Sequence, residues 1–211
     1  MFLFNLPATQ TAAAEHLFRS EVGRLGKFLV QMGGSVPTPD VLWDEMARAD
    51  EIRRRLLEAV QVSSGNRIPL ALAGGPVCAT HHRILEAIEA AGGRVILDGT
   101  ENGERNFCPQ LAPDGQGDPF EALVTAYFNH LTDVFQRPNS RLYEWLKLRV
   151  MSRHVRGIVL WLFTGCDLWR AEAQTLRERF GLPVLLLEAD DAAGISPRDV
   201  NRVQAFVEML K

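Results

Sequence analysis

The spacing of apolar residues changes twice along the chain, and each change predicts a different kind of element. A short apolar run over residues 2–6 stops at Pro7, as a buried strand would. Apolar side chains then recur every three or four residues over 11–32 and over 38–60, which predicts two amphipathic helices. A glycine pair separates the two helices, so we expect a helical hairpin near the N-terminus.

From residue 65 onward, continuous apolar runs alternate with helical spacing. The apolar runs predict strands at Ile68–Ala73, Val95–Leu97, Ile158–Phe163 and Val184–Leu187. Helical spacing predicts helices near residues 82–91, 118–135, 140–154, 167–180 and 197–210. This alternation predicts an α/β fold: a doubly wound, mostly parallel sheet with helices on both faces, preceded by the N-terminal helical hairpin.

The length fits one domain of ordinary to large size or two small ones. The 211 residues are 46% apolar, and we predict a single α/β domain in which residues 1–64 form the short strand and hairpin and 65–211 the α/β core. With 23 basic and 26 acidic residues the net charge is −3, so no nucleic acid partner is expected. No apolar stretch reaches the roughly 20 residues of a membrane span, and no signal peptide is recognisable, so we expect no membrane association.

Three cysteines, Cys78, Cys108 and Cys166, are widely spaced and form no C-x-x-C pair. An odd number of separated cysteines argues against a secreted disulfide scaffold and places the protein in the cytoplasm. There the three thiols are buried small hydrophobic groups, reactive thiols or metal ligands.

All three cysteines fall in or just beyond the segments that follow the predicted strands. In an open α/β sheet these segments meet at the carboxyl edge, where ligands bind. Cys166 lies between a buried strand and the start of a helix, where free backbone N–H groups and the helix dipole stabilise a thiolate; the alternative is a tight strand-to-helix turn. The loop from residue 99 to 117 is long enough for a functional role.

Other motifs near this edge are weaker. His81 and His82 follow Cys78, but adjacent histidines point apart, so a Cys–His hydrolase is not favoured. No G-x-G-x-x-G motif accompanies the glycines before Pro76, so a dinucleotide site is not expected. An acidic stretch, Glu188 to Asp191, offers carboxylates to a hard cation, although such loops are usually solvated.

Several motifs occur in a fixed order along the chain. They are Phe4-Asn-Leu-Pro7, Gly74-Gly-Pro76, Leu85 to Gly93, Asp98 to Phe107, Gly165-Cys-Asp167, Gly181-Leu-Pro-Val184, Leu187 to Asp190 and Arg202 to Phe206. In their order and spacing the chain resembles the 2-hydroxyacyl-CoA dehydratase D-component family, which includes subunits of 2-hydroxyglutaryl-CoA dehydratase and benzoyl-CoA reductase.

The resemblance implies a [4Fe-4S] cluster held by three cysteines and single-electron chemistry on an acyl-CoA thioester. Electron transfer to the thioester carbonyl would give a ketyl radical anion that expels the hydroxyl, or would reduce an aromatic thioester. The resemblance also implies a related subunit as partner in a dimer and an ATP-dependent activator that supplies the electron.

On this resemblance Cys166 matches a cluster ligand. The family's other two ligands come from an N-terminal region that this chain is expected to lack, so Cys78 and Cys108 complete the site or a separate polypeptide supplies the rest. Arg105 matches the family's pattern and is a candidate contact for a carboxylate or a CoA phosphate, with a surface ion pair as its ordinary role. Gly75 is predicted to line the substrate site. The alternative function is a cluster-free α/β partner or regulatory subunit without its own activity.

Overall fold

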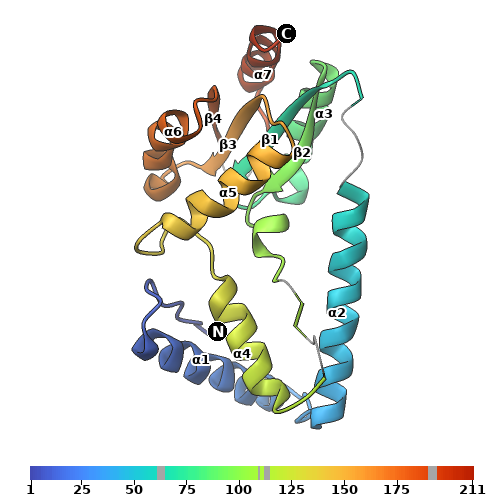
Figure 1. Ribbon diagram of the computed structural model, residues 1–211, viewed down its shortest axis with the longest axis vertical. Helices are drawn as coiled ribbons and strands as arrows, with labels where there is room; N and C mark the ends of the chain where they lie inside the picture. The colour runs from blue at the N-terminus through green and yellow to red at the C-terminus, as the bar shows by residue number, and fades with distance from the viewer. Residues whose placement is uncertain (61–64, 109, 112–114, 190–193) are drawn as a thin grey trace. The chain divides into compact units, whose positions relative to one another are not determined.

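The computed structural model describes residues 1–60, 65–108, 110–111, 115–189 and 194–211 (Figure 1). Contacts within the chain divide it into two compact units. Unit 1 comprises Met1–Leu56 and Phe107–Ser140, and unit 2 comprises Leu57–Asn106 and Arg141–Lys211. The expectation of a single domain stays a prediction.

Unit 2 contains a four-stranded sheet, and every strand predicted from residue 65 onward is present. The strands are β1 (Ile68–Gly74), β2 (Gly93–Gly99), β3 (Gly157–Phe163) and β4 (Val184–Ala189), in the order β2-β1-β3-β4. All three pairings are parallel. Strand β3 is central and buried over residues 157–162, because its side chains are apolar on both faces.

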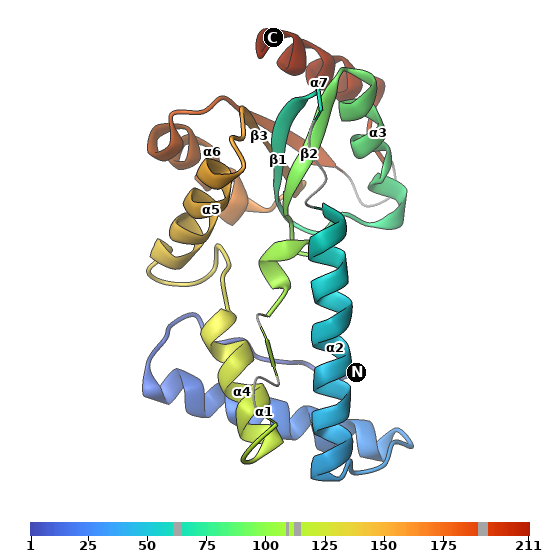
Figure 2. The ribbon, with the colours of Figure 1, turned by 45° about the vertical axis from the view of Figure 1, so that its right-hand side comes forward.

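Helices cover both faces of this sheet, which confirms the predicted α/β class (Figure 2). The helices of unit 2 are α3 (Arg83–Ala90), α5 (Ser140–Ser152), α6 (Asp167–Phe180) and α7 (Pro197–Met209), with short 3₁₀ helices η1 (Ala79–His81) and η2 (Glu104–Asn106). Helices α3 and α7 share one apolar cluster, in which Ile88 and Val207 are fully buried. On the other face, Trp145 of α5 and Trp169 of α6 are buried.

Unit 1 is helical. Its helices are α1 (Ala12–Gln31), α2 (Pro39–Val60), of which the part up to Leu56 lies in this unit, and α4 (Pro119–His130). Both predicted N-terminal helices are therefore present. Helix α1 packs against α4, where Phe18 and Phe128 are buried with their ring centroids 5.9 Å apart.

The strand predicted at residues 2–6 is wrong, because this segment forms no strand. A strand needs a neighbour for its backbone groups. Here the Asn5 N–H donates instead to the Glu21 carboxylate at 3.0 Å. The apolar side chains are used for packing on α1, where the Phe4 ring lies 5.8 Å from that of Phe18.

Helix α4 also ends earlier than predicted, at His130 rather than near residue 135. The chain then leaves the helical conformation and runs back against the N-terminal segment. The Gln136 amide donates to the Pro7 carbonyl at 2.9 Å, and the Arg137 N–H donates to the Ala8 carbonyl at 2.7 Å. These long-range bonds replace the helical ones that the local spacing favours.

Candidate functional site

The strand order of unit 2 defines one edge of the sheet as the candidate site. After β1 the chain crosses to β2 on one side, and after β2 it returns to β3 on the other side of β1. The direction of winding therefore changes between β1 and β3. In doubly wound folds, ligands bind at the carboxyl ends of the strands at such a switch point. We call the segments that follow β1 and β3, residues 75–82 and 164–166, the switch-point edge.

Cys166 lies on this edge at the start of α6. Gly165 has φ +88°, a conformation that glycine adopts without strain, and turns the chain from strand to helix. The Cys166 N–H donates to the Phe163 carbonyl at 3.0 Å, and its own carbonyl accepts the Arg170 N–H, so Cys166 is the N-cap residue. Its side chain is half-buried. Local sequence thus places the thiol at a helix N-terminus, as predicted.

Cys78 lies on the same edge, after β1, and its side chain is exposed. The Cys78 carbonyl accepts the His81 N–H at 2.8 Å, and the Cys78 N–H donates to His81 Nδ1 at 3.3 Å. These two bonds close a short ring between the cysteine and the histidine. His81 is fully buried, whereas His82 is exposed, so the adjacent histidines do differ in environment.

The glycines before Cys78 bring β1 close to β3. Gly74 has φ +124°, and a Cβ there would lie 1.8 Å from the Trp161 carbonyl oxygen. Gly75 is buried and donates its N–H to the same carbonyl at 2.9 Å. The loop after β2 contributes as well, because Asn102 Oδ1 accepts the Val77 N–H at 2.8 Å. The backbone leading to Cys78 is therefore fixed by its neighbours on two sides.

Arg105 is fully buried, which corrects the expectation of a surface ion pair. Its Nε donates to the Gly99 carbonyl and its Nη2 to the Gly74 carbonyl, each at 3.1 Å, and its guanidinium lies 5.1 Å from the Trp169 ring centroid. It thus joins the ends of β1 and β2 to the first turn of α6. Contact of Arg105 or Gly75 with a substrate stays a prediction.

The third cysteine, Cys108, belongs to unit 1 and has a different environment. It is 2% exposed and packs with Met46 and Leu111 in an apolar cluster. Burial raises the pKa of the Cys108 thiol to about 11. A thiol that is buried among apolar side chains and kept protonated is a poor metal ligand, because metals bind the thiolate.

No group of three or more His, Cys, Asp or Glu side chains is placed to hold a metal ion among the residues that the structure describes. Unit 2 brings two cysteines to the switch-point edge, one fewer than a three-cysteine cluster requires. Glu188 forms an ion pair with Arg170, at 2.6 Å, while Asp190 and Asp191 lie outside the described residues. The described part of unit 2 therefore does not fit a complete cluster by itself, and the arrangement of three cysteines stays a prediction.

Two features of unit 2, one on the switch-point edge and one in the segment after β2, gave no signal in the sequence. Glu104 is buried and accepts two bonds from Arg153, at 2.6 and 2.7 Å, although 49 residues separate them. His81 is buried against the rings of Trp161 and Phe163, with centroids 5.1 and 5.3 Å away. The burial of Glu104 and of His81 depends on residues that are distant in the sequence. The sequence itself indicated only that these side chains are polar.

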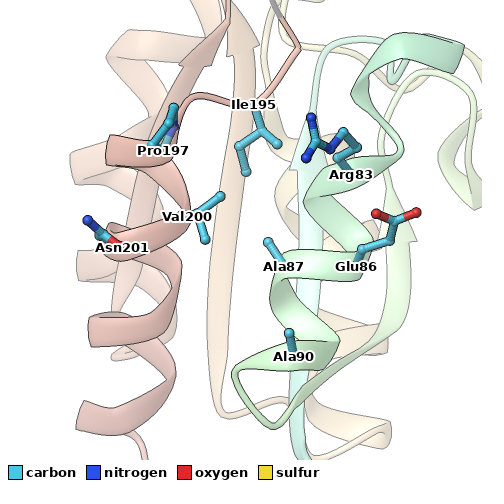
Figure 3. Close-up of a pocket in the computed structure, with 8 residues that line it drawn as sticks. All are labelled: Arg83, Glu86, Ala87, Ala90, Ile195, Pro197, Val200 and Asn201. Atoms are coloured by element: carbon cyan, nitrogen blue, oxygen red, sulfur yellow. The ribbon is translucent and has the colours of Figure 1, made fainter.

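A separate groove of about 450 Å³ lies between α3 and α7 (Figure 3). Its floor is apolar, with Ala87, Ala90 and Val200, and the polar side chains of Arg83, Glu86 and Asn201 lie on the two helices around it. The groove contains no cysteine and does not include the residues of the switch-point edge. We therefore place the candidate site at the switch-point edge.

Fold and site together define a doubly wound α/β protein with two cysteines at the switch point of its sheet. Residues 57–210 match the family model described as 2-hydroxyglutaryl-CoA dehydratase, D-component. The chain belongs to this family, which points to a subunit of the 2-hydroxyacyl-CoA dehydratase type. The matched residues include Cys78, Cys108 and Cys166.

A curated relative agrees with this assignment. Over 168 residues the chain is 24% identical to the protein named "Putative dehydratase subunit YjiM" of Escherichia coli (strain K12). The aligned region covers 78% of this chain and 43% of the relative. The chain thus spans less than half the length of the curated relative it matches. Among the described residues, no helix is long and apolar enough to cross a membrane.

Proposed function

We propose that this chain is a 2-hydroxyacyl-CoA dehydratase or benzoyl-CoA reductase-like subunit that acts on an acyl-CoA thioester in the cytoplasm. The observation that carries the proposal is the position of Cys166, at the N-terminus of α6 and on the switch-point edge, within the region that matches the family.

We further propose that Cys166 and Cys78 are the ligands that this chain provides to a [4Fe-4S] cluster. When bound, a cluster of this type supplies single electrons and an open iron to the thioester. The remaining ligand then has to come from outside unit 2, because the edge offers two thiols. Cys108 is disfavoured in that role by its apolar surroundings. A related subunit and an ATP-dependent activator are the partners that this proposal requires.

Reconstitution of the purified chain tests the cluster. Under anaerobic conditions, with iron, sulfide and a small thiol in excess to stand in for the missing ligand, the wild type is expected to bind iron and acid-labile sulfide. Cys166→Ala is expected to lose both, because one of the two proposed ligands is removed. Cys108→Ala is the matched control, since it also removes one thiol, and it is expected to retain both.

The two alternatives give different results. If the wild type remains free of iron and sulfide after reconstitution, the cluster proposal fails and the chain acts as a cluster-free partner or regulatory subunit. If Cys108→Ala loses iron as fully as Cys166→Ala, then Cys108 is a ligand and the assignment of Cys78 and Cys166 as the only two is overturned.

A further inference from the structure

His81 carries a buried N–H group for which the described part of the chain offers no hydrogen-bond acceptor. The side chain is fully buried, and Nε2 has no hydrogen-bond partner among the residues that the structure describes. Because Nδ1 accepts the Cys78 N–H, the proton of the neutral imidazole lies on Nε2. An unpaired donor in an apolar environment destabilises the folded state. A phenylalanine would fill the same space without this cost, so the packing of the ring does not explain the histidine.

The other ring nitrogen provides the explanation. Nδ1 is the acceptor for the backbone N–H of Cys78, and a second bond runs back from the His81 N–H to the Cys78 carbonyl. Cys78 is exposed, and no regular element holds it, because it lies between β1 and the three-residue η1. The imidazole therefore adds a bond at the Cys78 N–H to those that hold the preceding Gly75 and Val77.

The same ring reaches the strand that leads to Cys166. Its centroid lies 5.1 Å from that of Trp161 and 5.3 Å from that of Phe163, both on β3. Phe163 in turn accepts the Cys166 N–H through its carbonyl. Trp161 adds a second tie, since its Nε1 donates to the Pro76 carbonyl at 3.1 Å. A chain of direct contacts thus runs from Cys78 through His81 and Phe163 to Cys166.

We infer that His81 is a positioning residue that sets the separation of Cys78 and Cys166 across the switch-point edge. This inference rests on the proposed function, in which both thiols bind one thiophilic centre, and adds the residue that positions them. The Nδ1 bond holds the Cys78 backbone, and the ring contacts hold that segment against β3. His81 itself touches neither the substrate nor the cluster.

Spin labels on the two cysteines test the inference in metal-free protein. Nitroxides are attached to Cys78 and Cys166 in a Cys108→Ala background, and dipolar broadening reports the distance between them. His81→Phe keeps the ring and removes both nitrogens. We expect this variant to be as stable as the background or more so, and to lose the defined broadening, because the Cys78 N–H has lost its acceptor.

His81→Asn is the complementary variant, since its side-chain oxygen lies near the position of Nδ1 but the ring is gone. We expect lower stability and a broadening closer to that of the background. If His81→Phe keeps the background spectrum, His81 only packs, and the inference is overturned. This readout uses no iron, so its failure is distinct from an iron-free wild type in the reconstitution experiment, which contradicts the proposed function instead.

Discussion

At the scale of single residues, Gly74 and Gly75 offer a test of how closely β1 and β3 approach. A methyl group on Gly74 would lie 1.8 Å from the Trp161 carbonyl oxygen, and its φ of +124° is strained for any other residue. A methyl group on Gly75 would meet no atom within 4 Å. The two adjacent glycines therefore differ in what they tolerate.

We expect Gly74→Ala to lower the free energy of unfolding by about 3 kcal/mol or more, because the backbone of β1 must move. Gly75→Ala is the matched control and is expected to change it by less than about 0.5 kcal/mol. Denaturant unfolding followed by tryptophan fluorescence measures both. Equal losses in the two variants contradict the close approach. Weaker acyl-CoA binding by a stable Gly75→Ala variant, in contrast, supports the predicted place of Gly75 in the substrate site.

At the scale of elements, Arg105 links the ends of strands β1 and β2. Its guanidinium donates to carbonyls at the ends of β1 and β2 and lies over Trp169 in the first turn of α6. A lysine keeps the charge but has neither the planar group nor donors in two fixed directions. The structure therefore gives Arg105 a role that depends on its shape.

We expect Arg105→Lys to lower the free energy of unfolding by about 2–3 kcal/mol, which corresponds to the loss of well-aligned bonds from a buried charged donor. Arg170→Lys is the control, since Arg170 is partly exposed and pairs with Glu188 at the surface, and its effect is expected to stay below about 1 kcal/mol. Chemical denaturation measures both variants. A small effect of Arg105→Lys, similar to that of the control, argues against the structural role.

Most strands, and the start of helix α6, could be predicted from the local sequence, whereas the structure of the N-terminal segment could not. Strands such as Ile158–Phe163 were predictable because a continuous apolar run bounded by turn residues has few other structures open to it. The position of Cys166 followed from the same signals, since a buried strand, a glycine and a helix start lie next to one another. The segment 2–6 also is a short apolar run, but its Phe4 ring packs against Phe18 of α1, and the segment does not pair with a strand.

Burial of polar residues was not predictable in the same way. His81 and His82 are adjacent and alike in sequence, yet one is fully buried and the other exposed. Arg105 became a buried hydrogen-bond donor because carbonyls at two strand ends and a tryptophan from a later helix surround it. Segments that are far apart in the chain form such environments, so a local sequence pattern does not predict them.

At the scale of the whole molecule, the three cysteines lie in two different units and in different environments. Cys78 and Cys166 belong to unit 2 and have exposed or half-buried side chains, whereas Cys108 lies in the apolar cluster of unit 1. Burial raises the Cys108 pKa to about 11 from an ordinary value of 9.0, so folding favours the protonated thiol. The stability that the protonated, buried Cys108 thiol contributes is fully present below its ordinary pKa of 9.0. It is lost as the pH rises through its pKa in the folded protein, about 11.

We therefore expect iodoacetamide at near-neutral pH to modify Cys78 in the folded chain and to leave Cys108 unmodified until unit 1 unfolds, since the reagent needs an accessible thiolate. Peptide mass mapping across a urea gradient measures each site separately. Leu111→Ala is the informative variant, because Leu111 is 3% exposed beside Cys108 and its truncation opens the cluster without changing the thiol. In Leu111→Ala, Cys108 is expected to be modified at a lower urea concentration than in the wild type, whereas the modification of Cys78 is expected to stay the same. Rapid modification of Cys108 in the native wild type would show that this thiol is available as a ligand, and the assignment of cluster ligands to unit 2 alone would then have to be abandoned.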